Sequence, residues 1–162
     1  MKRLVVIATL LAAFTVPLAL AADTPADGTL SVKRGRGTLV LKLKGTVIGR
    51  VARNGRVQIR DFRPFDGYDP QLTCRPHARE IRTGLWLCKG RNIGFRIDKG
   101  RFNVTVRGTG ISISAVGRGN VTVDGAGDTG VNDGTMSIDA APYESLPDFS
   151  TTFVLGTPPP GP

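Results

Sequence analysis

Short runs of alternating apolar and polar residues, separated by glycine, constrain the fold of this chain more than any other feature. In one run, Leu39, Leu41 and Leu43 alternate with Lys42 and Lys44. The same alternation returns at residues 57–59, 93–97, 102–106, 111–113, 121–123 and 136–138. A period of two places each apolar set on one face of a strand and each polar set on the other. The pattern predicts an all-β protein of half-buried antiparallel strands.

Two blocks of this pattern are similar to each other. Residues 37–46 align with residues 100–109 at an offset of 63, and residues 55–59 align with 119–123 at an offset of 64. Apolar positions and glycines match in both blocks. The repeat predicts two similar strand groups, packed as a small antiparallel β-sandwich or wound as a short β-solenoid.

The two ends of the chain differ from the strand-forming part. Lys2 and Arg3 precede an apolar stretch at residues 4–13, and Ala19-Leu20-Ala21 has the small residues of a signal peptidase site. We therefore expect a signal peptide at 1–21, a single domain at 22–156 and a Pro-rich tail at 157–162. This organisation predicts a secreted or envelope-associated protein with no transmembrane anchor after cleavage.

A glycine-rich stretch at residues 108–125 resembles a known group of proteins. It is similar to secreted, glycine-rich all-β repeat proteins of high-GC bacteria, and the similarity extends over residues 30–155. The resemblance implies an all-β fold and an extracytoplasmic compartment. Its motifs are strand-and-glycine patterns, so it transfers no functional residue.

An insert at residues 61–91 separates the repeated blocks and reads as irregular. It contains both cysteines, Cys74 and Cys88, and the only histidine, His77. Two cysteines in an exported chain usually pair, so we expect a disulfide that fixes the insert. A metal site made of Cys74, His77 and Cys88 is the alternative, but no fourth ligand stands out. We expect no metal and no cofactor.

Acidic residues suggest two further sites. Asp66 and Asp69, with His77, could form the acid–base site of a small secreted hydrolase, although aspartates between glycine and proline also cap turns. The Asp/Gly-rich segment 124–134 contains calcium-type ligands but matches no calcium-loop pattern in register. We expect turns and a hairpin loop at these places and no catalytic residue.

Positive charge is the strongest functional signal. Residues 31–107 contain 19 basic and 5 acidic residues, a net of +14, whereas residues 108–162 have a net of −5. The alternation directs several basic side chains away from the core, and the insert adds others. The candidate binding residues are Lys42, Lys44, Arg56, Arg60, Arg75 and Arg79.

We therefore expect a non-enzymatic, exported binding or envelope-associated module that contacts an anionic surface, a glycan or a protein. Three alternatives remain open: charges that only maintain solubility, a small hydrolase, and a purely structural extracellular domain. Export disfavours nucleic acid as the partner.

Overall fold

The computed structural model describes residues 26–75 and 78–156, and all of its regular structure is β-strand. The predicted signal peptide, the Pro-rich tail and His77 lie outside the described residues. The strands are β1 (Gly28–Asp61), β2 (Gln71–Thr73), β3 (Arg79–Arg82), β4 (Leu85–Gly90), β5 (Ile93–Ile97), β6 (Arg101–Gly125), β7 (Thr135–Ile138), β8 (Glu144–Ser145) and β9 (Thr151–Leu155). In this part of the chain, no helix is long and apolar enough to cross a membrane.

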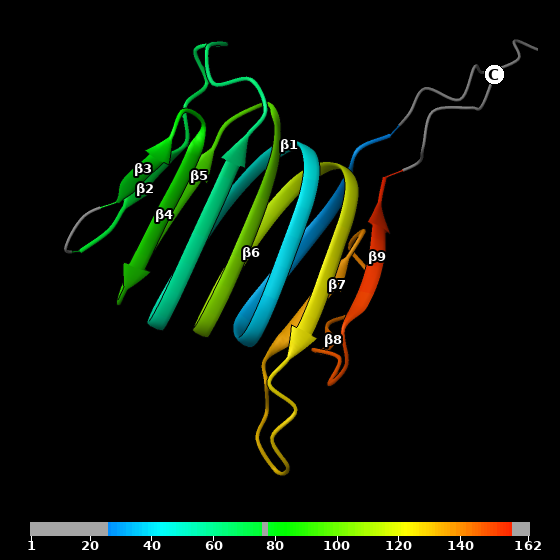
Figure 1. Ribbon diagram of the computed structural model, residues 1–162. Helices are drawn as coiled ribbons and strands as arrows, with labels where there is room; N and C mark the ends of the chain where they lie inside the picture. The colour runs from blue at the N-terminus through cyan, green and yellow to red at the C-terminus, as the bar shows by residue number, and fades with distance from the viewer. Residues whose placement is uncertain (1–25, 76–77, 157–162) are drawn as a thin grey trace, which may run out of the picture.

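Two long strands, β1 and β6, dominate the molecule. They wind around each other in antiparallel pairing and curl the sheet into a half-barrel (Figure 1). Residues 37–44 of β1 pair with 101–108 of β6 on one side and with 118–125 on the other. Residues 45–51 and 28–32 both pair with residues 111–117. Each long strand therefore passes back and forth between two layers.

The remaining strands extend the two layers. The first layer consists of residues 36–44, 55–61, 101–109 and 118–125 with β3, β4 and β9. The second layer consists of residues 28–35, 45–53 and 110–117 with β2, β5, β7 and β8. The prediction of an all-β, antiparallel fold is confirmed, and the layers arise because the same strands coil around one core.

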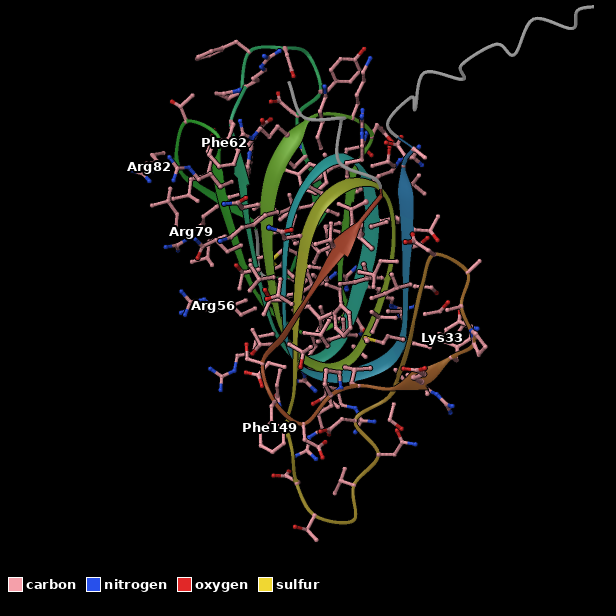
Figure 2. The ribbon with its side chains drawn as sticks, turned by 90° about the vertical axis from the view of Figure 1, so that its right-hand side faces the viewer. Lys33, Arg56, Phe62, Arg79, Arg82 and Phe149 are labelled. Atoms are coloured by element: carbon pink, nitrogen blue, oxygen red, sulfur yellow. A yellow bond between two sulfur atoms is a disulfide. The ribbon has the colours of Figure 1, made fainter. Side chains whose placement is uncertain are left out.

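The core lies inside the coil (Figure 2). The alternating apolar residues predicted to be buried are buried, among them Leu39, Leu41, Leu43, Val57, Ile59, Ile93, Phe95, Phe102, Val104, Val106, Ile111, Val121 and Val123. Inward side chains of the first layer pack against those of the second in a single cluster. Burial of this apolar surface is the main stabilising term for such a fold.

Glycines allow the long strands to turn between the layers. At Gly37 the φ angle is 133°, and a Cβ atom would lie 2.1 Å from the carbonyl oxygen of Asp124. At Gly119 the φ angle is 141°, and a Cβ atom would lie 2.1 Å from the carbonyl oxygen of Lys42. Both positions therefore need glycine for two reasons, the backbone conformation and the close approach of a neighbouring strand.

The two aligned sequence blocks occupy corresponding places in the first layer. Residues 37–44 pair directly with 101–108, while 55–61 flanks the second block and 118–125 flanks the first. If each segment is exchanged with the one it aligns to (37–44 with 101–108, and 55–61 with 118–125), the order of strands across the layer stays the same. The second layer has the same symmetry. Residues 28–32 pair with 113–117 in the way that β5 pairs with residues 47–51.

The insert is more regular than its sequence indicates. Residues 62–70 are a loop, but β2, β3 and β4 follow and join both layers. Alternation is hidden in β4 because Leu85 and Leu87 on its outer side are as apolar as Trp86 and Cys88 on its inner side. The predicted disulfide between Cys74 and Cys88 is present. Cys74 follows β2 of the second layer and Cys88 lies in β4 of the first, so the bond joins the layers.

Candidate anion-binding face

The outer side of the first layer carries most of the predicted binding residues. Lys42 and Lys44 lie on one segment of β1, Arg56 and Arg60 lie on another, and residues 101–108 of β6 run between them. All four side chains are exposed because the alternation buries their neighbours. Figure 2 shows Arg56, Arg79 and Arg82 projecting outward from the same side of the molecule. The topology thus brings together residues that are distant in sequence.

Ten basic residues make up this surface, which we call the basic face. They are Lys42, Lys44, Arg56, Arg60, Arg79, Arg82, Lys89, Arg101, Arg107 and Arg118. Arg75, another predicted binding residue, is not one of the ten. It follows β2, and its carbonyl oxygen lies beside Gly90 at the end of β4. Arg96, which also alternates outward in the sequence, belongs to β5 of the second layer and pairs with Asp98 there.

Like charges stand directly opposite one another on the basic face. Arg56 is the register partner of Lys89 on β4 and of Arg107 on β6. Six residues along the strands, Lys44 is the register partner of both Arg101 and Arg118. Two rows of three positive charges therefore cross the face, about 20 Å apart at the usual rise of a strand. Like charges in directly opposite positions destabilise a sheet.

Few of these charges are neutralised within the protein. Among the described residues, Arg36, Arg96 and Arg118 account for all ion pairs, and Arg118, which pairs with Asp27, is the only one of them on the basic face. The other nine basic side chains of the face have no carboxylate partner in this part of the chain. Between the two charged rows lie Lys42 and Arg60, one on each side of Asn103, together with the neutral residues Gln58 and Thr105.

The outer side of the second layer is different in character. Its outward positions alternate neutral residues with a few cations: Thr46, Ser112, Ser114, Gln71 and Thr73 are neutral, and Lys33, Arg50 and Arg96 are basic. The second layer thus carries fewer outward cations than the first, and one of them, Arg96, is paired with Asp98. Composition could not reveal this asymmetry, since it depends on which segments share a layer.

An aromatic residue borders the basic face. Phe62 follows β1 directly and is 41% exposed. The guanidinium carbons of Arg60 and Arg101 lie 5.0 and 5.5 Å from the centre of its ring, within the range of cation–π attraction. Beside Phe62, a groove of about 850 Å³ opens between the loop after β1 and the loop before β6. Aromatic and charged groups therefore meet at this end of the face.

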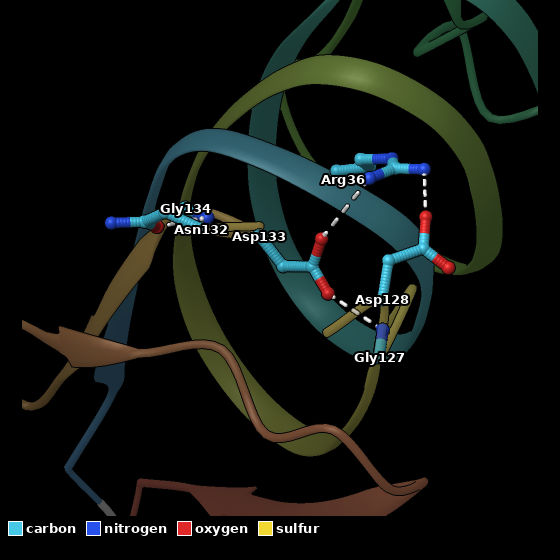
Figure 3. Close-up of polar contacts among 6 residues, drawn as sticks. All are labelled: Arg36, Gly127, Asp128, Asn132, Asp133 and Gly134. Atoms are coloured by element: carbon cyan, nitrogen blue, oxygen red, sulfur yellow. Dashed lines mark hydrogen bonds and ion pairs between the residues drawn. The ribbon is translucent and has the colours of Figure 1, made fainter. Parts of the chain in front are cut away.

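The Asp/Gly-rich segment is a connection between layers and not the hairpin loop expected from the sequence. It leaves β6 in the first layer and enters β7, which pairs with β1 in the second. Figure 3 shows its carboxylates facing Arg36. Asp128 forms an ion pair with Arg36, and the buried Asp133 accepts a hydrogen bond from the backbone N–H of Gly127 at 2.7 Å. A guanidinium and backbone N–H groups therefore organise this segment.

Aspartates of the insert act as turn caps. Asp61 accepts a hydrogen bond from the backbone N–H of Arg63 at 2.7 Å, and Asp66 accepts one from that of Tyr68 at 3.0 Å. This is the turn chemistry that the sequence suggested. Within the described residues, no group of three or more His, Cys, Asp and Glu side chains is arranged to hold a metal ion.

A second polar cluster escaped sequence reasoning. The Ser31 hydroxyl and the Tyr143 phenol are hydrogen-bonded at 2.8 Å, and the Lys33 ammonium lies 3.8 Å from the centre of the Tyr143 ring. The hydrogen bond with Ser31, then hydrogen bonding and charge from Lys33, lower the pKa of Tyr143. Ser31 and Lys33 share a strand face, a signal visible in the sequence, but nothing local connects them to Tyr143.

Removing these partners should raise the pKa of Tyr143. We expect Ser31→Ala to shift ionisation of the phenol to higher pH, because the phenolate loses a donor, and Lys33→Met to do the same by removing a positive charge. Ultraviolet absorbance of the phenolate measures this. Tyr68→Phe removes the other of the two tyrosines and so isolates the signal. Unchanged titration in both variants would show that the cluster does not persist in solution.

Comparison with protein-family models, with curated proteins and with solved structures finds no match to this chain. The disulfide is typical of an oxidising, extracytoplasmic environment.

Proposed function

We propose that the protein is an exported, non-enzymatic binding module that contacts polyanions through the basic face. Export is part of the proposal: it is based on the signal-like residues 1–21 and agrees with the disulfide between Cys74 and Cys88. Its partner is an anionic polymer of the cell envelope or its surroundings. No cofactor or catalytic residue is invoked.

The observation that carries the proposal is the pair of like-charged rows. Arg56 stands between Lys89 and Arg107, and Lys44 stands between Arg101 and Arg118. Solubility requires only that surface charges be numerous and of mixed sign, whereas each of these rows contains positive charges alone. A bound polyanion would remove their mutual repulsion. Repulsion within the rows lowers the stability of the free protein, and an anionic partner gives a reason for keeping them.

The alternatives receive less support. A hydrolase in the insert would need Asp66 as an acid or base, but this carboxylate caps a turn and is exposed to water. A purely structural domain gives no reason for gathering unpaired charge on one layer. Nucleic acid shares the required negative charge, and it is separated from other polyanions by the experiments below.

Neutralising the predicted residues should abolish most polyanion binding. We expect the variant K42Q/K44Q/R56Q/R60Q to bind an immobilised polyanion at least about fourfold more weakly, since each of four exposed ion pairs contributes about 0.2–1 kcal/mol. Retention of the unmodified protein should fall as salt rises, because exposed charges are screened over about 8 Å at physiological ionic strength. Elution from a heparin-type column across a salt gradient measures both effects.

A matched control changes the same number of charges on the other layer. Lys33, Arg34, Arg50 and Arg96 are exposed and lie on second-layer segments, so replacing all four with Gln alters net charge equally. We expect this variant to elute close to the unmodified protein. If both variants lose retention equally, net charge and not the basic face governs binding. If the unmodified protein is not retained at low salt, the proposed function is wrong.

A further inference from the structure

We infer that the groove beside Phe62 is a sugar-binding subsite, so that the polyanion held by the basic face is an acidic polysaccharide. This inference rests on the proposed function and specifies the class of its partner. The groove has a volume of about 850 Å³, which is sufficient for one or two sugar rings. Lys44 and Arg101 line it and also belong to a charged row of the basic face. A polymer lying on the face can therefore enter the groove without a break in contact.

Two aromatic rings border the groove. Phe62 and Tyr68 line it and are 41% and 45% exposed. Each ring has a cation beside it: Arg60 and Arg101 next to Phe62, and the Lys99 ammonium 5.7 Å from the centre of the Tyr68 ring. The C–H face of a pyranose packs on an exposed aromatic ring, and adjacent cations pair with carboxylate or sulfate substituents. An acidic sugar meets both requirements.

Carboxylates distinguish the groove from the rest of the basic face. Asp27, Asp66 and Asp98 all line it. One oxygen of each is engaged, with Arg118, with the backbone N–H of Tyr68 and with Arg96, respectively. Among the described residues, no hydrogen bond or ion pair involves the second oxygen of these three. Sugar hydroxyls donate well to such oxygens.

The same carboxylates disfavour nucleic acid in the groove. A DNA backbone has a negative charge on every unit and no hydroxyl group to donate to a carboxylate, so three aspartates would repel it without any compensating hydrogen bond. Each ring of an acidic polysaccharide combines a charged substituent with hydroxyl donors, which matches rows of cations that lead into a groove of mixed charge. Charge complementarity along the whole path therefore favours an acidic glycan over a nucleic acid.

Two polycarboxylates, one with sugar rings and one without, test the inference. Polygalacturonate and poly-glutamate both present carboxylates, but only the former has pyranose rings. We expect F62L/Y68L to weaken polygalacturonate binding about tenfold and to change poly-glutamate binding less than about twofold. The ring-preserving variant F62Y/Y68F should bind both like the unmodified protein. Titration calorimetry of the full folded protein at low salt measures these affinities.

The outcomes separate this inference from the proposed function. If F62L/Y68L weakens both polymers equally, or neither, the groove does not recognise sugar, while the basic face stands. If oligothymidylate binds more tightly than polygalacturonate and loses affinity in F62L/Y68L, the rings stack on bases and the glycan inference is overturned. If no polyanion binds the unmodified protein, the proposed function itself fails.

Discussion

Gly37→Ala is expected to lower the free energy of unfolding by about 3 kcal/mol. Two costs combine at this position. The φ angle of 133° is one that residues with a side chain rarely adopt, and the added Cβ would approach the carbonyl oxygen of Asp124 to 2.1 Å. The neighbour is backbone of a paired strand, which cannot rotate away. Urea denaturation followed by circular dichroism measures the loss.

Gly100→Ala is the matched control, because it separates the two costs. Its φ angle is 132°, nearly that of Gly37, but no atom lies within 4 Å of the added Cβ. We expect this variant to lose about 1 kcal/mol, the cost of backbone strain alone. Equal losses in the two variants would mean that strain accounts for both, and that the close passage of residues 37 and 124 is not retained in solution.

Removing the disulfide is the second change with a large expected effect. We expect C74A/C88A to lower the free energy of unfolding by about 3 kcal/mol, the usual value for a loop of this size in the chain-entropy model. The bond also joins β2 of the second layer to β4 of the first. Its loss should therefore loosen the insert before the coil formed by β1 and β6.

Hydrogen exchange with mass spectrometry locates that effect. Amides of residues 79–90 should exchange faster in C74A/C88A, and amides of residues 101–108 should keep their protection, because the latter pair on both sides with β1. The polyanion affinity should fall less than in K42Q/K44Q/R56Q/R60Q, since only Arg79, Arg82 and Lys89 lie on the loosened strands. Uniformly faster exchange would show that the disulfide supports the whole coil.

Local patterns were sufficient to predict strand segments of β1, β5, β6 and β7, the residues buried in them and the disulfide, but not β2, β3 and β4 of the insert or β8 and β9 near the C-terminus. Leu39, Leu41 and Leu43 are buried because alternation and pairing follow the same period. The coil was not predictable, since it depends on residues 37–44 having two different partner segments of the same strand, 101–108 and 118–125. The alternating pattern of a strand does not show with how many other strand segments that strand will pair.

The candidate site was predictable to a similar extent. Lys42, Lys44, Arg56 and Arg60 were expected to face outward, and they do. The opposition of Arg56 to Arg107 and of Lys44 to Arg118 is a property of register, and register is set by long-range packing. The groove beside Phe62 was equally hidden, because Asp27, Lys99 and Tyr68 are far apart in sequence and meet only when the layers close.

The coiling of β1 and β6 also protects the protein against aggregation. In the described part of the chain, every long segment of these two strands that lies within a layer is paired on both sides. The edge strands of the two layers are β2, β3, β8 and β9, and they are only 3, 4, 2 and 5 residues long, respectively. Short margins offer few unpaired backbone groups to another chain, and β3 adds two arginines that repel an identical copy. A chain rich in Val and Ile strands can thereby stay dispersed even though its sequence, in the unfolded state, has many segments able to form intermolecular sheets.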